Sequence, residues 1–274
     1  MKNPFGPVQM VREGSGPPLV LLHCLGVDHH FWDFAKPLAA DFTVYRYDLP
    51  GHGTSAIPSK GYDIADLSEQ LADLLKTEGL DRIHLAGISL GGLIAQQFAA
   101  AHSGSVDRLI LIDTTPRYTD EMRATWTERA ASARQGGPAT LIEGLLKIWF
   151  SAPAIERNDH AVQYVHTTLS KCNGEGYALA CEALAAADLR SVLGQIKAPT
   201  LIVCGDDDIP SFLDASRLLL SSIGQATLTW IPQARHASVL ERSDLGLRAM
   251  RKFLQGAGTA AADNQQTMGL KARN

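Results

Sequence analysis

The sequence is poor in cysteine and has no long apolar run. Its 274 residues include 4 cysteines, which lie far apart and lack the spacing of a metal site. In a chain of this size that pattern favours reduced thiols over a disulfide framework. No window approaches the roughly 20 apolar residues of a membrane-spanning helix, and the start, MKNPFGPVQM, has no apolar leader followed by a small-residue cleavage site. We therefore expect a cytoplasmic protein with no membrane partner.

An excess of positive charge is also missing. The chain has 25 Lys and Arg against 29 Asp and Glu, a formal net charge of −4, so no nucleic-acid partner is expected. Neither the dinucleotide-binding nor the phosphate-binding glycine pattern occurs, and no internal repeat is visible. With 45% hydrophobic and 20% charged residues, the composition is that of a globular protein. A small molecule is the expected partner, and the oligomeric state stays open.

Short apolar runs recur along the chain, with helical segments between them. They cover 18–23, 42–48, 82–88, 108–113, 200–206 and 226–232. Such alternation predicts an α/β protein with a mostly parallel sheet and helices on both faces, and the alternating VQMVREG near the start suits an antiparallel edge strand. One helix is predicted from Ile64 to Leu75, because its apolar residues share one face between the capping residue Asp63 and Gly79.

The pattern changes in the second half of the chain. From about Pro116 to Lys197 the strand signal disappears, and Ala-rich helical stretches are broken at QGGP, SAPA and CNGEG. We expect a helical cap at 116–197, inserted into a core formed by 1–115 and 198–256. Residues 257–274 lack periodicity and are rich in small and polar side chains, which predicts a disordered tail.

The stretch RIHLAGISLGGLIAQQFAA, residues 82–100, joins an apolar strand directly to a helix. A turn this tight needs small residues on both flanks, and it holds Ser89 outward at its apex. A serine hydroxyl becomes a nucleophile when an adjacent base removes its proton and a third group orients that base. A turn serine with local hydrogen bonds is the alternative, but the flanking strand and helix favour a nucleophile.

On such a turn the acid and the histidine should follow in that order, from loops at the same sheet edge. CGDDDIPSF places Asp206, Asp207 and Asp208 just beyond one strand, and IPQARHASVL places His236 just beyond the next. At most one of the three carboxylates can orient the histidine. Asp113, at the end of LILID, is a rival from a different strand, so spacing alone leaves Asp208 and Asp113 both open.

Acyl transfer also needs two backbone N–H donors for the oxyanion. One should come from Leu90, the residue after the proposed nucleophile. The other should come from the loop after the LVLLH strand, where Leu25 is the candidate.

With these motifs in place, the sequence resembles the α/β-hydrolase family over residues 1 to about 256. The resemblance rests on LLHCLG, RYDLPGHGTS, HLAGISLGG, LIVCGDDD and QARHASVLE. Within that family it is most similar to the 3-oxoadipate enol-lactonases, through LGVDHHFWD and the cap stretches ARQGGPATLIEGLLKIWF and CNGEGYALACEALAAADLRSVLGQIKAPTLIV. The resemblance implies an α/β-hydrolase fold. It also favours Asp208 as the acid, because family members commonly carry it three residues after the strand-ending glycine, here Gly205.

The resemblance further implies a serine hydrolase, without cofactor or metal, that opens an enol-lactone of aromatic degradation through an acyl-enzyme on Ser89. Because such substrates carry a free carboxylate, a basic cap side chain should pair with it, and Arg129 and Arg134 are candidates. A solvated surface arginine is the alternative for each. Trp149 and Phe150 stand where the resemblance has an aromatic pair, which either contacts substrate or packs cap against core.

Other functions of the same fold are alternatives. A general carboxylesterase, an amide hydrolase or a C–C bond hydrolase would use the same turn and donors, since selectivity depends on the shape of the pocket. A non-enzymatic small-molecule receptor and a cofactor-free oxygenase that uses His236 as a base are further alternatives.

Overall fold

A seven-stranded sheet lies at the centre of the computed structural model, which describes residues 5–6, 8 and 10–256. Across the sheet the order is β1-β3-β2-β4-β5-β6-β7. β1 pairs with β3 antiparallel, and every other pair is parallel. The prediction of a mostly parallel sheet with an antiparallel edge strand is confirmed. The strands are β1 (Val11–Gly14), β2 (Pro18–Leu22), β3 (Thr43–Arg46), β4 (Ile83–Ile88), β5 (Val106–Ile112), β6 (Thr200–Gly205) and β7 (Ala226–Ile231).

The strand register brings the carboxyl ends of the parallel strands to one edge. Ile88 of β4 lies opposite Ile112 of β5, and Ile112 in turn lies opposite Val203 of β6. Gly205, the last residue of β6, lies opposite Ile231 of β7. The loops that leave these strands therefore meet at one edge of the sheet, which is where ligands bind in open α/β sheets.

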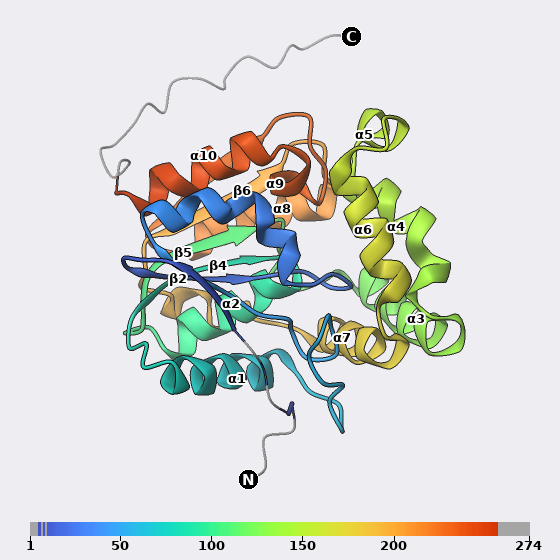
Figure 1. Cartoon of the computed structure of the whole chain (residues 1–274), viewed down its shortest axis with the longest axis horizontal. Coiled ribbons are helices and arrows are strands. Elements are labelled where there is room, and N and C mark those ends of the chain that lie inside the picture. Colours follow the sequence, from blue (N-terminus) through green and yellow to red (C-terminus); the bar gives the residue numbers. More distant parts are fainter. Residues whose placement is uncertain (1–4, 7, 9, 257–274) are drawn as a thin grey trace.

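Helices cover both faces of the sheet. Strands β2, β4 and β6 are almost entirely buried, which explains why they are continuous apolar runs. In Figure 1, α1 and α2 lie below the sheet, and η1 and α10 lie above it. No helix in the described part of the chain has both the length and the apolar character needed to cross a membrane. The elements of the core are η1 (His29–Ala40), α1 (Ile64–Thr77), α2 (Leu90–Ala101), η3 (Leu193–Gln195), α8 (Pro210–Ser222), α9 (Ser238–Glu241) and α10 (Ser243–Leu254).

Helix α1 begins and ends close to its predicted limits. The side chain of Asp63 accepts a hydrogen bond from the backbone N–H of Asp66, and the Asp66 side chain accepts one from the N–H of Asp63. The helix ends at Thr77, and Gly79 follows with a φ of 69° that suits glycine.

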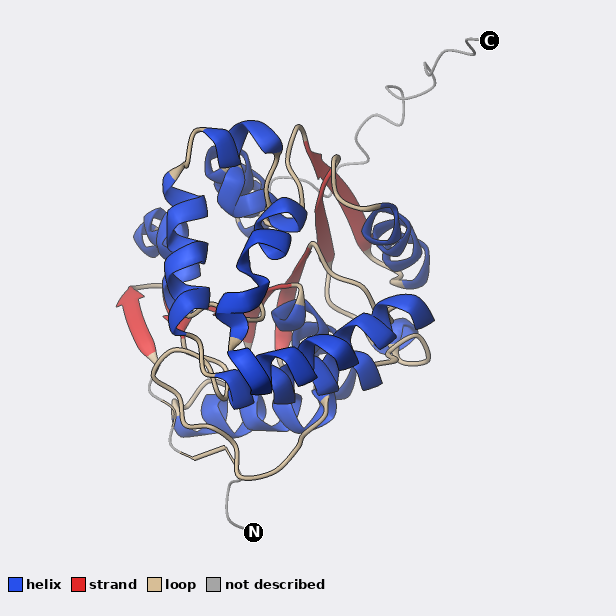
Figure 2. Ribbon diagram, turned by 90° about the vertical axis from the view of Figure 1, so that its right-hand side faces the viewer, coloured by secondary structure: helices blue, strands red, loops and turns tan. Residues whose placement is uncertain are grey.

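Between β5 and β6 the chain forms a separate group of helices, here called the inserted helices. This group lies beside the carboxyl edge of the sheet (Figures 1 and 2), and a bridge between Arg117 and Asp188 joins the two ends of the segment. The boundaries predicted for the cap, 116–197, and for the core, 1–115 and 198–256, stay predictions, and the predicted tail at 257–274 lies outside the described residues. The inserted helices are α3 (Asp120–Gly136), η2 (Pro138–Leu141), α4 (Ile142–Trp149), α5 (Ala152–Glu156), α6 (His160–Lys171) and α7 (Gly174–Ala186).

Candidate active site

Ser89 occupies the sharp turn between β4 and α2. Its φ of 52° and ψ of −110° lie in a region that L-residues rarely adopt. Two glycines make the turn possible: a Cβ on Gly87 would clash with the backbone oxygen of Gly91, and a Cβ on Gly91 would clash with that of Leu22. The N–H of Ser89 donates to the carbonyl of Ile112 at 2.9 Å. The strained turn is thus fixed against β5, with Ser89 at the carboxyl edge of the sheet.

The structure brings Ser89, His236 and Asp208 into one hydrogen-bonded chain. Nε2 of His236 lies 3.2 Å from Oγ of Ser89, and Nδ1 of His236 lies 3.0 Å from Oδ2 of Asp208. All three residues are less than 10% exposed, at 6%, 7% and 5% respectively. When Nδ1 carries the ring proton and donates it to Asp208, Nε2 is free to accept the proton of the Ser89 hydroxyl. This arrangement is chemically able to activate Ser89 as a nucleophile.

The pKa of His236 is raised above its ordinary value of 6.5. Burial by itself would lower it, because a buried site disfavours the charged imidazolium. The negative charge and hydrogen bond of Asp208 outweigh that effect, and the charge of Asp113 adds to it. The site therefore favours the imidazolium form of His236, which is the form that removal of a proton from Ser89 would produce.

The three successive carboxylates after β6 have different surroundings. Asp208 is buried and its second oxygen, Oδ1, accepts from the N–H of Ile209 at 2.7 Å. Asp206 is exposed, and its Oδ1 accepts from the N–H of Gln233 at 2.7 Å. Asp207 is exposed as well. Of the carboxylates that the sequence left open, Asp208 contacts the imidazole.

Asp113, the rival, faces backbone rather than imidazole. Its Oδ1 accepts from the N–H of Gly205 at 3.0 Å, and its Oδ2 accepts from the N–H and the hydroxyl of Ser238 at 3.0 and 2.7 Å. The carboxyl group is fully buried, and its pKa is raised by that burial and by the nearby charge of Asp208.

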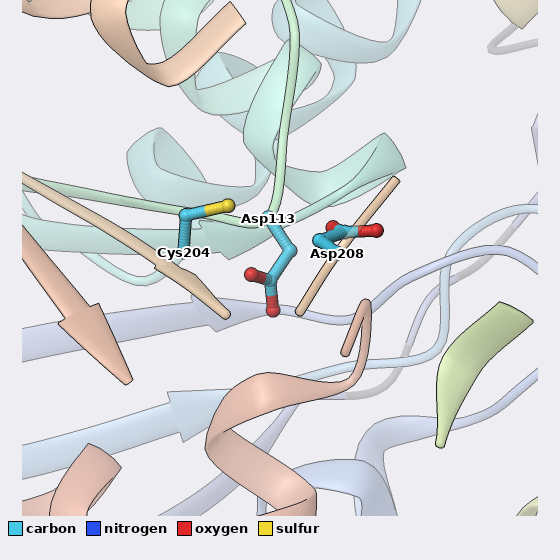
Figure 3. Close-up of side chains that lie close together, drawn as sticks. All are labelled: Asp113, Cys204 and Asp208. Carbon is cyan, nitrogen blue, oxygen red and sulfur yellow. The ribbon is translucent and has the colours of Figure 1, made fainter. Parts of the chain in front are cut away.

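Asp113, Asp208 and Cys204 form a compact cluster (Figure 3), whose potential ligand atoms all lie within 4.8 Å of one another. The donor set suits a metal ion poorly. Both oxygens of Asp113 already accept hydrogen bonds, and those of Asp208 accept from Ile209 and His236. Burial raises the pKa of the Cys204 thiol and keeps it protonated, whereas a metal ligand must be a thiolate. In this cluster Asp208 hydrogen-bonds to His236, and Asp113 hydrogen-bonds to the backbone of Gly205 and Ser238.

The two residues predicted to supply oxyanion donors lie near Ser89. Leu25 lines the same cavity as Ser89, and Leu90 is the first residue of α2, where a backbone N–H has no acceptor within the helix. Among the described residues, neither N–H donates to another backbone group. Both are therefore available to an oxyanion, although this role stays a prediction.

A cavity of about 180 Å³ opens onto Ser89 and His236. Its few polar groups besides this pair are Thr125, Arg129 and Tyr177. The cavity is therefore suited to a small, largely apolar molecule held by a few polar contacts. Most of the wall is apolar, formed by Leu25, Met122, Trp126, Leu145, Ile148, Trp149, Ile209 and Phe212.

The two candidate cap arginines have different positions. Arg129 lines the cavity, with its guanidinium carbon 4.7 Å from the centre of the Trp126 ring, and it forms no ion pair with a carboxylate in the described part of the chain. Arg134 is not part of the cavity wall, so the prediction for it needs correction. Its Nε lies 2.7 Å from Oε2 of Glu175, and Glu182 also pairs with it, at the exposed side of α3 and α7.

The two candidate aromatic residues, Trp149 and Phe150, also differ in position. Trp149 lines the cavity, and its ring centre lies 6.4 Å from that of His236. Phe150 is fully buried and does not line the cavity, because the chain becomes extended after α4 and neighbouring side chains then point apart. The carbonyl of Trp149 accepts from the N–H of Ala237 at 3.0 Å, next to His236. Helix α4 is thereby joined to the loop that carries the histidine.

Several wall residues escaped the sequence analysis. Phe212 has its ring centre 4.2 Å from that of His236, and it lies in the first turn of α8, just after the loop that carries Asp208. This closeness to Asp208 in the sequence could have indicated that Phe212 lies near the site. Trp126 and Tyr177 had none, because an aromatic residue in a helix is as readily a core residue as a pocket residue.

Comparison with known proteins agrees with this architecture. A family model described as the alpha/beta hydrolase fold matches residues 17–243. The chain is 28% identical over 249 residues to 3-oxoadipate enol-lactonase 1 of Acinetobacter baylyi, covering 90% of this chain and 92% of that protein. It is 32% identical over 256 residues to the pimeloyl-acyl-carrier protein methyl ester esterase of Chromobacterium violaceum, covering 88% and 96%. The solved enol-lactonase of Burkholderia xenovorans LB400 superposes with a TM-score of 0.86 at 32% identity, covering 90% of this chain and 96% of that one.

Proposed function

Because the chain belongs to the α/β-hydrolase family, we propose that it is a serine hydrolase that opens a small lactone or ester bearing a free carboxylate. 3-Oxoadipate enol-lactone is the first candidate substrate, which similarity to the two enol-lactonases supports. One observation carries the choice of an anionic substrate. Arg129 lines a mainly apolar cavity beside Ser89 and His236, and no carboxylate of the described chain neutralises it.

In the first half of the reaction, Oγ of Ser89 attacks the lactone carbonyl carbon while its proton moves to Nε2 of His236. The buried carboxylate of Asp208 stabilises the resulting imidazolium through Nδ1. The N–H groups of Leu25 and Leu90 donate to the oxyanion. The ring C–O bond then breaks, the leaving oxygen takes the proton from Nε2, and the opened chain remains bound to Ser89 as an ester.

In the second half, His236 removes a proton from a water molecule, and the oxygen of that water attacks the ester carbonyl. The bond to Oγ of Ser89 breaks, and Nε2 returns the proton to Ser89. A carboxylate of the substrate paired with Arg129 would hold the reacting carbonyl in one position beside Ser89 through both steps. Such positioning of the reacting groups accelerates a reaction. No cofactor takes part in this sequence.

A direct assay tests the proposal. The purified protein should hydrolyse 3-oxoadipate enol-lactone, and mass spectrometry of quenched reactions should find an acyl group on Ser89. Ser89→Ala should lower kcat by about 10⁴-fold or more, because the remaining groups lack a nucleophile. Its circular dichroism spectrum should match that of the wild type. Turnover by Ser89→Ala at the wild-type rate would refute the serine mechanism.

General esterase activity is the second candidate, favoured by the apolar wall of the cavity and by the esterase among the relatives. A panel of neutral esters, amides and C–C bond substrates of similar size separates it from the first. A preference for neutral esters over the lactone would favour the esterase. Slow, single-turnover acylation of Ser89 by every substrate would instead favour a receptor role.

A further inference from the structure

Asp113 is tied to both loops that complete the hydrogen-bonded chain. It follows β5, and its φ of 43° turns it into a conformation that is uncommon for a residue other than glycine. One carboxylate oxygen accepts from the N–H of Gly205, three residues before Asp208. The other accepts from the N–H and the hydroxyl of Ser238, two residues after His236. A single buried side chain thus spans the acid loop and the histidine loop.

The surroundings of Asp113 favour a carboxylate over an amide. The N–H of Gly205 and the N–H and hydroxyl of Ser238 are all donors to its oxygens, and the nearby Cys204 thiol is protonated. An asparagine would have to point its NH₂ group at one of these donors, whereas a carboxylate has only acceptors. Placing a second carboxylate within 4.8 Å of Asp208 is unfavourable. The three hydrogen bonds to Asp113 must offset this repulsion between the two carboxylates. We take this as an indication that Asp113 contributes to the arrangement of the site.

We propose that Asp113 is a positioning residue, which holds the acid loop and the histidine loop together so that Asp208 and His236 stay in hydrogen-bond contact. This inference rests on the proposed function, because it concerns the same nucleophile and base. Asp113 does not contact the imidazole or Ser89 by any hydrogen bond in the described residues, so it acts through Gly205 and Ser238.

The charge of Asp113 has a second effect. The charged groups that influence His236 are Asp208 from the loop after β6, Asp113 from the end of β5, and Arg129 from α3. The two carboxylates raise the pKa of the imidazole and Arg129 lowers it. Removal of the charge at Asp113 should therefore lower the pKa of His236.

Reaction of Ser89 with a fluorophosphonate tests the proposal without knowledge of the substrate. The rate of phosphonylation is measured against pH for the wild type, Asp113→Asn and Asp206→Asn. Asp206 is the matched control, since it lies in the same loop, is exposed, and as asparagine can still accept from Gln233. Asp113→Asn should react about 10- to 100-fold more slowly, with its acid midpoint shifted to lower pH. Asp206→Asn should match the wild type in both.

A merely structural role predicts a different result. Loss of folded protein would reduce the amplitude of labelling but leave the rate and the pH midpoint of the folded fraction unchanged, and this would overturn the proposal. If Asp113→Asn does not fold, Ser238→Ala decides, because it removes one donor and keeps the carboxylate. A rate about fivefold lower or more supports the proposal, and the wild-type rate overturns it. Absence of labelling in the wild type itself would instead refute the proposed serine mechanism.

Discussion

Arg129 gives the sharpest test of substrate class. In Arg129→Met the charge is lost while a shorter, unbranched apolar side chain remains beside Trp126. A hydrogen bond to a charged group contributes about 1.5–3 kcal/mol, and partial exposure of Arg129 favours the lower end of this range. Since about 1.4 kcal/mol corresponds to a factor of ten, kcat/KM for 3-oxoadipate enol-lactone should fall about 10- to 30-fold.

The assay compares the lactone with p-nitrophenyl acetate, which has no carboxylate. For this neutral ester the same variant should keep kcat/KM within about a factor of five, because it loses only contacts worth less than about 1 kcal/mol. Arg129→Lys should recover part of the activity on the lactone, since it restores the charge without the planar guanidinium.

Arg134→Met is the matched control. It removes an arginine from the same helix, but one whose charge pairs with Glu175 and Glu182 away from the cavity. Both substrates should be hydrolysed as by the wild type. Equal losses on lactone and neutral ester in Arg129→Met, or no loss on the lactone, would refute the assignment of Arg129 to a substrate carboxylate.

Three further predictions follow from other parts of the site. The acid limb of kcat/KM should have its midpoint above pH 6.5, because His236 must be neutral to accept a proton and its pKa is raised from that value; a midpoint below 6.5 would contradict the pairing with Asp208. Gly91→Ala should lower the free energy of unfolding by about 1–3 kcal/mol, since the new Cβ meets the backbone oxygen of Leu22; urea titration beside Gly104→Ala, where a Cβ has no neighbour within 4 Å, measures the difference. Tyr118→Phe should raise the free energy of unfolding by about 1 kcal/mol, because the buried hydroxyl lies near Ser89 yet lacks the geometry of a hydrogen bond; lower stability in the same titration would show that this hydroxyl has a partner.

The parts of the fold that local chemistry determines could be predicted from the sequence. The strand that leads to Ser89, the small residues of the turn and the helix that follows are consecutive, so their pattern is visible without tertiary information. Helix α1 has the same advantage, since its cap at Asp63 and its apolar face lie within one segment. The shared edge of the parallel strands then followed from the alternation of strands and helices.

Spacing alone left Asp208 and Asp113 open, and only the resemblance to the family favoured Asp208; the folded chain shows which carboxylate contacts the imidazole. Both residues end up near the same sheet edge, and only the direction of each side chain separates them. Asp113 turns back toward Gly205 and Ser238, whereas Asp208 meets His236. Spacing along the sequence carries no information on such directions.

The wall of the cavity was less predictable for a related reason. Arg129 and Arg134 lie five residues apart on α3, which places them about 140° apart around the helix. The buried residues of helix α3, which are Trp126, Ala130 and Ala133, share one face at i, i+4 and i+7. Two of the three are alanines, so the apolar stripe gives only a weak signal in the sequence. Which face of the helix meets the cavity was therefore decided by long-range packing.

The backbone contact between Trp149 and Ala237 joins the wall of the cavity to the loop that carries the proposed base, His236. Nearby, the carboxylate of Glu241 accepts a hydrogen bond from the N–H of Ser151 at 3.1 Å. This is a second hydrogen bond between the end of α4 and the segment that follows His236. Any outward movement of α4 must break these hydrogen bonds or move His236 as well. Redesign of this helix for bulkier ligands should for that reason keep both hydrogen bonds. If they are lost, we expect turnover to fall even where affinity improves, because His236 is displaced.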